Sequence, residues 1–380
     1  MHIADIRSFP VSFPVPADKS VTLGLGRTIK RDAVLVRVET SEGHVGWGEA
    51  HHGRCPGAVS KVVETTLREL VVGRDPMDVV GNWAHVYRMQ LASHGVGAAA
   101  AMALSGLDCA LWDIRAQAAQ WPLYRLLGGA SKPVKAYAGG ISLGFQPASQ
   151  LVEEAQRLQA RGFRALKLRV GDTTARDIER VHAVRRALGP DMEILVDANT
   201  GYSLEDVRRV MPALEEAGVG WLEEPFPPHD RRSYAEARQL GRVPLAAGEN
   251  HFTRFDFTSL IEEGNVRFIQ PDLSKTGGIT EALRIAAMAS AYKLSLNPHT
   301  SATAPNMAAT IHFLCALDNP GYFEADVTEL NPFRDQLADR PPYALDSEGC
   351  VRPYEGVSSG LVIDPAFIAE HPLIEGPCYV

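Results

Sequence analysis

EILVDANTGY (193–202) is an apolar run that ends on a carboxylate, Asp197, and then turns. The same pattern returns twice along the chain, ending on Glu223 and on Glu249, so the three acids are separated by equal intervals of 26 residues. An interval of this length accommodates one strand, one helix and the return to the next strand. The repeat therefore predicts that the three carboxylates end neighbouring parallel strands at the same height.

Eight short apolar stretches follow one another from about residue 134, and each of the first seven precedes a helix-like segment. They are VKAYAGG (134–140), FRALKLRV (163–170), EILVDAN (193–199), VGWLEEP (219–225), VPLAAGEN (243–250), VRFIQPD (266–272), LSLNPH (294–299) and GYFEAD (321–326). Eight such units are typical of a closed parallel barrel of the α/β class. A doubly wound open sheet is disfavoured because GLGRT (24–28), the one Gly-x-Gly near a strand, lacks the third glycine of a dinucleotide-binding turn.

The residues before the barrel pattern predict a smaller α+β domain. Apolar and polar side chains alternate in three stretches, as in half-buried antiparallel strands, and a period of 3.6 residues follows, as in helices. The strands are predicted at 2–9, 33–40 and 44–50, and the helices at 57–73, 78–90 and 97–120. We expect a capping domain over 1–125, a barrel over 126–350, and a segment over 351–380 that returns to the capping domain, since a closed barrel has no place for it.

Composition limits the classes of partner. The chain has 380 residues, a formal net charge of −8 and 45% hydrophobic residues, which gives no electrostatic reason to expect nucleic acid. No apolar run of about 18 residues predicts a membrane span. The five cysteines are odd in number and widely separated, which favours a reducing cytoplasm over a disulfide framework or a zinc site.

The predicted strand ends gather charged and polar side chains at one mouth of the barrel. In chain order they are Lys167, Arg169, Asp197, Asn199, Glu223, Glu249, Asp272, His299 and Glu324. Three carboxylates within a few Å of one another repel by several kcal/mol per pair even at an effective dielectric constant of about 20. A divalent cation removes that repulsion, and hard oxygen ligands favour magnesium over zinc. For any one of the acids, a helix cap or an ion pair remains an alternative.

The stretch AMALSGLDCALWDIRAQAAQWPLYRLLGG (101–129) resembles the signature of the mandelate racemase/muconate lactonizing enzyme group of the enolase superfamily. Together with the strand ends, the resemblance spans essentially the whole chain. It implies a modified TIM barrel, (β/α)7β, with an N-terminal α+β capping domain completed by the C-terminal segment. It also implies Mg²⁺ and abstraction of the proton α to a carboxylate, which gives an enediolate.

The resemblance also implies roles for individual residues. Asp197, Glu223 and Glu249 resemble the metal ligands, Asp272 and His299 match the dyad of the mandelate racemase subgroup, and Glu324 matches an acid that hydrogen-bonds the substrate carboxylate. Gln270 stands where the muconate lactonizing subgroup has a second catalytic lysine, which disfavours that subgroup.

The sequence departs from the family pattern at one position. Lys167-Leu168-Arg169 replaces Lys-x-Lys, and a guanidinium is a poor general base because it does not lose its proton. Racemisation needs a base on each face of the substrate, so we predict a sugar-acid dehydratase acting on an aldonate or aldarate, with His299 as base and acid. A racemase or epimerase, a cycloisomerase and a non-catalytic sugar-acid binder remain alternatives.

Substrate contacts are predicted on two loops, 13–32 and 49–57, that resemble the lid loops of the family. The candidates there are Lys19, Arg27, Lys30 and Arg31 in the first loop and His51 and His52 in the second, with Tyr137 and Asn199 added from the barrel. The expected partner is a small carboxylate substrate. Homo-oligomerisation is an expectation from the resemblance alone.

Overall fold

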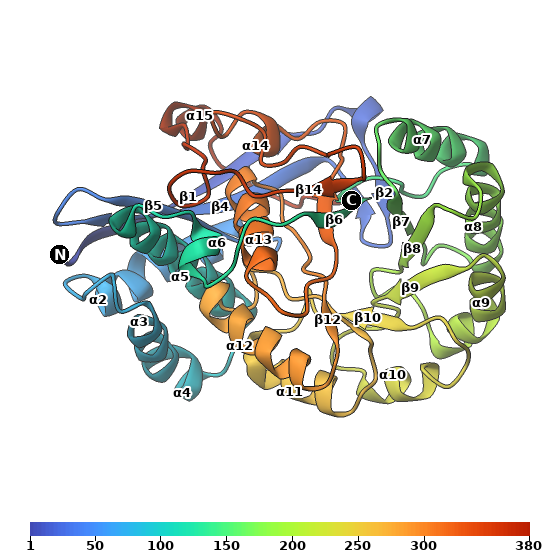
Figure 1. Cartoon of the computed structure of the whole chain (residues 1–380), viewed down its shortest axis with the longest axis horizontal. Helices are drawn as coiled ribbons and strands as arrows, with labels where there is room; N and C mark the ends of the chain where they lie inside the picture. Colours follow the sequence, from blue (N-terminus) through green and yellow to red (C-terminus); the bar gives the residue numbers. More distant parts are fainter.

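Eight parallel strands form the barrel in this computed structural model, which describes residues 1–380 (Figure 1). They are β6 (Val134–Gly139), β7 (Ala165–Arg169), β8 (Glu193–Asp197), β9 (Val219–Glu223), β10 (Leu245–Ala247), β11 (Phe268–Ile269), β12 (Ser295–Leu296) and β13 (Phe323–Asp326). Neighbours in sequence are neighbours in space, and β13 pairs with β6. A parallel bridge between Leu296 and Pro320 joins the remaining edges, so the predicted barrel is confirmed.

A helix follows each of the first seven strands, which gives the order (β/α)7β. The helices are α7 (Ala148–Ala160), α8 (Thr174–Leu188), α9 (Leu204–Glu216), α10 (Arg231–Ala237), α11 (Thr253–Glu262), α12 (Gly278–Ala291) and α13 (Ala304–Cys315). Local sequence explains where they begin. Ser203, for example, starts α9 with a capping box in which its hydroxyl and the Asp206 carboxylate each accept a backbone N–H of the other residue.

Alternation along the strands sends every second side chain into the barrel. Tyr137, Ala165, Leu195, Trp221 and Ala246 fill its interior as one apolar cluster. Side chains two residues further along β7, β8 and β9 point inward as well, and these are charged: Lys167, Asp197 and Glu223. Arg169 pairs in register with Asp197, and Asp197 with Glu223, so these side chains lie at one height as the spacing predicts.

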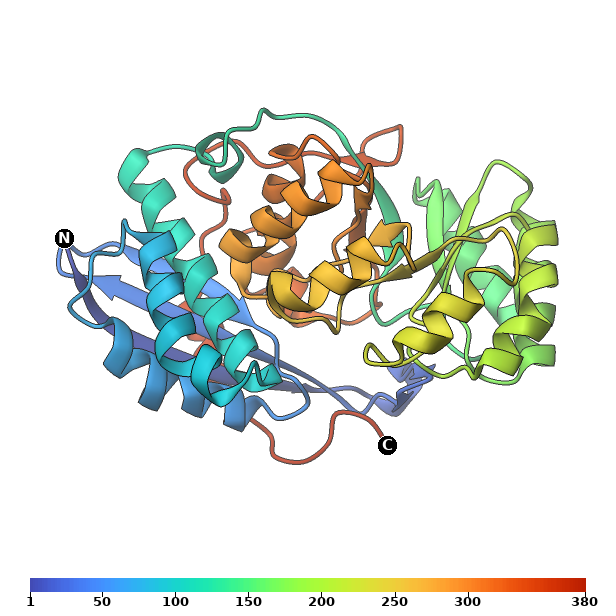
Figure 2. The same ribbon diagram turned by 90° about the horizontal axis from the view of Figure 1, so that it is seen from below.

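The N-terminal unit is a three-stranded antiparallel sheet covered by helices (Figure 2). Its strands are β1 (Ile3–Pro14), β4 (Lys30–Thr40) and β5 (Val45–Ala50). Its helical segments are α1 (Pro56–Lys61), η2 (Val62–Leu67), α2 (Arg68–Val71), α3 (Val79–Val86), η3 (Tyr87–Leu91), α4 (Ala92–His94), α5 (Ala98–Ala119) and α6 (Leu123–Leu126). A turn η1 (Ala17–Lys19) and a hairpin of β2 (Thr22–Leu23) and β3 (Gly26–Arg27) extend from it toward the barrel.

Helix α5 lies between the sheet and the barrel, and glycines permit its close approach. A Cβ atom on Gly46 would meet the carbonyl oxygen of Ala110 at 2.1 Å, and one on Gly48 would meet that of Gly106 at 2.2 Å. On its other side the indole of Trp112 donates a hydrogen bond to Thr280 of α12 (2.9 Å). The helix therefore fastens the two units together.

The remaining residues cover the outside of the barrel and return to the N-terminal sheet. They contain α14 (Pro332–Asp335), β14 (Cys350–Val351), which pairs with β6, and α15 (Pro365–Glu370). Phe367 and Ile368 of α15 pack in one apolar cluster with Val11 and Leu35 of the sheet. The strand-like stretch 360–364 forms only a single bridge, from Ile363 to Ala338. No helix of the chain has the length and apolar character that crossing a membrane requires.

Candidate active site

Lys167 lies at the centre of the charged layer and is fully buried. Its ammonium donates to Oε1 of Glu223 at 2.8 Å and lies 3.1 Å from Oε1 of Glu324 and 3.4 Å from Oδ2 of Asp197. Burial alone would lower the pKa of Lys167, but Glu223 and Glu324 outweigh it and hold the pKa well above its ordinary value. Lys167 is therefore a fixed positive charge.

Arg169 lies beside Lys167 and makes a forked set of contacts. One terminal amino group donates to Asp197 and to Oδ1 of Asn199 (3.3 Å), and the other donates to the carbonyl of Gly140. Burial would lower the pKa of Arg169, but Asp197 and the other carboxylates raise it. The guanidinium stays charged, so it can bind an anion and cannot remove a proton.

His299 and Asp272 form a hydrogen-bonded pair at the ends of β12 and β11. Nδ1 of His299 donates to Oδ2 of Asp272 at 2.6 Å, and Nε2 lies 2.8 Å from Oε2 of Glu249. The hydroxyl groups of Ser274 and Ser301 each donate to Asp272 at 2.7 Å, which fixes the carboxylate beneath the ring. Burial would lower the pKa of His299, but Glu249, Glu324 and the bond to Asp272 raise it to about 10.

Asp197, Glu223 and Glu249 come from three adjacent strands, and a cation contacts each one. Arg169 binds Asp197, Lys167 binds Glu223, and His299 binds Glu249. The ligand oxygens of the three acids do not all lie within 4.8 Å of one another. Burial raises the pKa of Glu223 to about 7, with Lys167 opposing the rise and Asp197 adding to it.

The donor set fits magnesium. The three acids offer only hard carboxylate oxygens, which Mg²⁺ prefers. Beside them Glu224 is buried, with Oε2 accepting from the Asn250 amide (2.7 Å) and Oε1 lacking any hydrogen-bond partner. Burial and the neighbouring Glu249 raise the pKa of Glu224 well above its ordinary value. A divalent cation near Glu224 and the three acids would offset the repulsion among their carboxylates.

A cavity of about 520 Å³ opens above the charged layer. Of the predicted residues, Arg169, Asn199, Glu249 and His299 line it from the barrel side, and Arg31, His51 and His52 line it from the N-terminal unit. Asn199 has φ 44°, a left-handed conformation that an asparagine tolerates and that turns the chain sharply after β8. The site therefore lies between the strand ends and the N-terminal unit.

Comparisons with known proteins agree with this arrangement. Residues 9–128 match the family model for the mandelate racemase / muconate lactonizing enzyme N-terminal domain, and residues 150–366 match the model described as enolase C-terminal domain-like. The chain belongs to the enolase superfamily. A crystal structure of an enolase-superfamily member from Polaromonas sp. JS666 is 52% identical, with a TM-score of 0.97 and all of both chains covered.

Two curated relatives indicate the kind of chemistry within the superfamily. An arabinonate dehydratase from Saccharolobus solfataricus is 32% identical over 88% of this chain and 90% of its own length. A D-galactarolactone cycloisomerase from Agrobacterium fabrum is 32% identical over 90% of this chain and 91% of its own length. These names support an enolase-superfamily enzyme of the sugar-acid dehydratase or cycloisomerase type.

Glu324 does not line the cavity, and its predicted role toward the substrate carboxylate stays a prediction. The side chain is fully buried below the cavity, where it forms an ion pair with Lys167 (3.1 Å) and accepts from the N–H of Gly140 (3.1 Å) and from the N–H of Thr300 (3.3 Å). Burial would raise the pKa of Glu324, but Lys167 and His299 lower it to about 2. An ionised carboxylate only accepts hydrogen bonds, so Glu324 orients Lys167 in this enolase-superfamily site.

Tyr137, Arg27 and Lys30 do not line the cavity. Tyr137 is enclosed in the barrel interior, with its hydroxyl unpaired and its ring 5.4 Å from the ammonium of Lys167. Arg27 is exposed on the β2–β3 hairpin. Lys30 is buried and its ammonium lies 3.0 Å from Oδ2 of Asp32. Alternation along a strand predicts which face Lys30 occupies, but it does not predict that Asp32 forms an ion pair with it.

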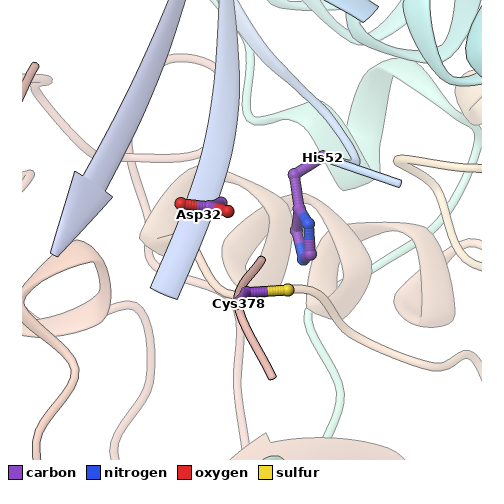
Figure 3. A group of neighbouring side chains, drawn as sticks. All are labelled: Asp32, His52 and Cys378. Atoms are coloured by element: carbon purple, nitrogen blue, oxygen red, sulfur yellow. The ribbon is translucent and has the colours of Figure 1, made fainter. Parts of the chain in front are cut away.

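The partner of Lys30 belongs to a cluster of Asp32, His52 and Cys378, whose ligand-type atoms lie within 4.8 Å of one another (Figure 3). The Ser12 hydroxyl donates to the other oxygen of Asp32 at 2.6 Å. The Lys30 ammonium already balances the charge of Asp32, and it would repel a metal ion placed in this cluster. The cluster instead joins β4, the loop after β5 and the segment around residue 378.

His51 and His52 stack with ring centroids 4.3 Å apart, and both are fixed by backbone donors. The N–H of Gly53 donates to Nδ1 of His51 at 2.9 Å, and the N–H of Arg54 donates to Nδ1 of His52 at 3.0 Å. Burial, with help from Lys275, lowers the pKa of His52 to about 3. Both rings are therefore neutral and present Nε2 as the free nitrogen.

Several cavity residues lay outside the sequence prediction. They are Glu224, Asn250, Lys275, Asp326 and Tyr379. Lys275 is buried and lies 3.9 Å from Oε1 of Glu249. The available signals were weak: Glu224 is the second acid of EEP, and Lys275 follows Asp272 in a turn. Tyr379 carries no periodic signal because its position depends on pairing with a distant loop.

Proposed function

We propose that this enzyme dehydrates a sugar acid, an aldonate or aldarate, to the corresponding 2-keto-3-deoxy acid. The observation that carries the proposal is the asymmetry of the site. His299 offers a nitrogen to the cavity with Asp272 behind it, whereas Arg169, the residue in the second position of the family's Lys-x-Lys pattern, is a guanidinium held charged by Asp197. One proton-transfer group suits elimination better than racemisation, which needs two.

His299 carries both proton transfers in this proposal. Its Nε2, once it is unprotonated and no longer paired with Glu249, takes the proton from the carbon next to the substrate carboxylate, and that electron pair forms a double bond as the C–O bond on the neighbouring carbon breaks. His299 then returns the proton to the departing hydroxyl, so that one water leaves. The resulting enol rearranges to the 2-keto acid. Asp272 holds the ring in the tautomer that this sequence requires.

The other charged residues stabilise the negative charge that develops on the substrate carboxylate. Lys167 and Arg169 place two fixed cations beside the cavity floor, and Glu324 orients the first of them. Asp197, Glu223 and Glu249 are the residues that would hold Mg²⁺. When bound, the ion supplies Lewis-acid polarisation of the substrate oxygens.

Cycloisomerisation is the second candidate, and the similarity to D-galactarolactone cycloisomerase favours it. That reaction also needs one group to move a proton, so His299 with Asp272 serves it equally well. The two reactions differ in mass balance, since dehydration loses a water and isomerisation does not.

The test incubates the purified enzyme and Mg²⁺ with a panel of aldonates, aldarates and their lactones. Semicarbazide detects 2-keto products, and mass spectrometry in D₂O follows water loss and deuterium uptake. A 2-keto product one water lighter than the substrate supports dehydration. A product that keeps the mass of the substrate apart from incorporated deuterium supports cycloisomerisation, and exchange that yields both configurations at the α-carbon contradicts the single-base argument. No turnover of any acid would refute the proposal.

A further inference from the structure

The wall of the cavity opposite the barrel carries cations that the proposed chemistry does not use. Arg31 comes from β4, Arg54 from the loop after β5, and both line the cavity together with Tyr379. These residues belong to the N-terminal unit and to the segment that pairs with it, whereas the proton-transfer groups belong to the barrel. The cavity therefore has a reacting side and a recognition side.

Arg31 is a buried guanidinium without a carboxylate partner. Its side chain is 4% exposed, its Nε donates to the carbonyl of Leu330 (2.9 Å), and neither terminal amino group makes a hydrogen bond. The chain has two other buried arginines, and each is paired with an acid: Arg169 with Asp197 and Arg180 with Asp172 (2.8 Å). A buried charge is costly unless it is paired, so the free fork of Arg31 requires an explanation.

Asp326, the acid with the largest effect on the pKa of Arg31, is not that partner. Burial lowers the pKa of Arg31, and Asp326 offsets part of the shift. No carboxylate oxygen lies within 4 Å of the guanidinium, and Asp326 accepts instead from the N–H of Thr328 (2.9 Å) and from the Asn331 amide. The two terminal amino groups of Arg31 remain available to the cavity that they line.

Arg54 and Tyr379 complete the same wall. The guanidinium carbon of Arg54 lies 5.1 Å from the centroid of the Tyr379 ring, and neither the Arg54 side chain nor the Tyr379 hydroxyl has a hydrogen-bond partner in the protein. The backbone positions the ring, because the N–H of Ile29 donates to the carbonyl of Cys378 (3.0 Å) and the N–H of Arg27 to that of Val380 (2.8 Å).

We propose that Arg31, Arg54 and Tyr379 form a subsite for a second carboxylate of the substrate, so that the preferred substrate is a sugar diacid (an aldarate). This inference rests on the proposed function for the reacting end. A guanidinium fork binds a carboxylate through two parallel hydrogen bonds, with a phenol as an additional donor. The hydroxyl end of an aldonate would leave Arg31 buried without a counter-charge.

The experiment compares an aldarate with the aldonate of the same chain length and configuration. In the unaltered enzyme we expect kcat/KM to favour the aldarate by roughly 100-fold, as for other sites whose buried charge needs its partner. Arg31→Met should remove most of that preference, measured as the ratio of kcat/KM for the two acids. Arg27→Met is the matched control, since Arg27 is an exposed arginine of the β2–β3 hairpin that does not line the cavity.

Two further variants cover the case in which Arg31→Met does not fold. Arg54 is exposed and Tyr379 is partly exposed, so we expect the Arg54→Met and Tyr379→Phe variants to fold. Each should reduce the preference for the aldarate by roughly tenfold. Thermal-shift titration with both acids measures binding without turnover. Equal binding of diacid and monoacid, or stronger binding of a phosphate-ended acid, would overturn the subsite.

Failure of the subsite and failure of the proposed function give different results. If no acid loses water but the diacid still binds more tightly and Arg31→Met abolishes that difference, the proposed reaction is wrong and the subsite stands. If water is lost equally from both acids, the reaction stands and the subsite is wrong.

Discussion

Nδ1 of His299 lies 2.6 Å from Oδ2 of Asp272, and the carboxylate is fixed in turn by two serine hydroxyls. This pairing leaves Nε2 as the nitrogen that faces the cavity. We therefore predict that His299→Asn lowers kcat/KM by roughly 10²–10⁴-fold while the affinity for the acid changes little. Steady-state kinetics and binding titration check this. His94→Asn, an exposed histidine, is the control, and an active His299→Asn enzyme would exclude the proposed base.

Magnesium dependence is predicted from the three carboxylates at adjacent strand ends. A chelator should abolish turnover, and Mg²⁺ should restore it. Glu223→Gln removes one ligand oxygen charge at constant shape and should weaken Mg²⁺ or Mn²⁺ binding by at least about tenfold, measured by calorimetry or Mn²⁺ paramagnetic resonance. Glu193→Gln changes an exposed acid at the opposite end of β8 and should have no effect. Equal metal affinity in both variants would contradict the ligand assignment.

Arg169 is predicted to act as a fixed charge. Arg169→Lys keeps the charge and loses the fork that holds Asp197, Asn199 and Gly140, so kcat/KM should fall roughly tenfold. Arg169→Met removes the charge and should cost roughly 10²–10³-fold. Deuterium exchange at the α-carbon measures any base on that face. Faster exchange with inversion in the unaltered enzyme than in Arg169→Met would show that Arg169 does transfer protons.

Asp108 on α5 gives a pH prediction for stability. Burial raises the pKa of Asp108 to about 7, against its ordinary value of 3.8, although the N–H of Thr280 donates to it at 2.9 Å. The folded state therefore binds the proton more tightly than the unfolded state, so this residue costs stability increasingly as pH rises from about 4 to about 7.

Asp108→Asn removes that cost and keeps an oxygen for the Thr280 N–H. Relative to the unaltered protein, the variant should gain stability with rising pH over the same window, by up to about 4 kcal/mol. Denaturant unfolding at several pH values measures the difference. The exposed Asp191→Asn should show no such trend, and a pH-independent difference for Asp108→Asn would contradict the shifted pKa.

The barrel and the reacting side of the site could be predicted from the sequence because both follow from periodicity. Strand alternation and the equal spacing of Asp197, Glu223 and Glu249 fix which side chains meet at the mouth, whatever the loops do. Their metal-binding and catalytic roles remain predictions.

The recognition side could not be predicted in the same way. Lys30 and Arg31 are adjacent in sequence, yet one is neutralised by Asp32 and the other faces the cavity unpaired. Tyr379 reaches the cavity only because its segment pairs with the residues around Thr28. Contacts between segments so far apart leave no pattern within either segment.

The close packing of α5 has a consequence for how the cavity can open. Backbone meets backbone where α5 packs on Gly46 and Gly48 of the N-terminal sheet, and the Trp112–Thr280 hydrogen bond joins the same helix to the barrel, which disfavours hinge motion between the two units. We expect opening of the cavity to come instead from the segment at 15–29, which contributes Leu23 and Leu25 to its lining.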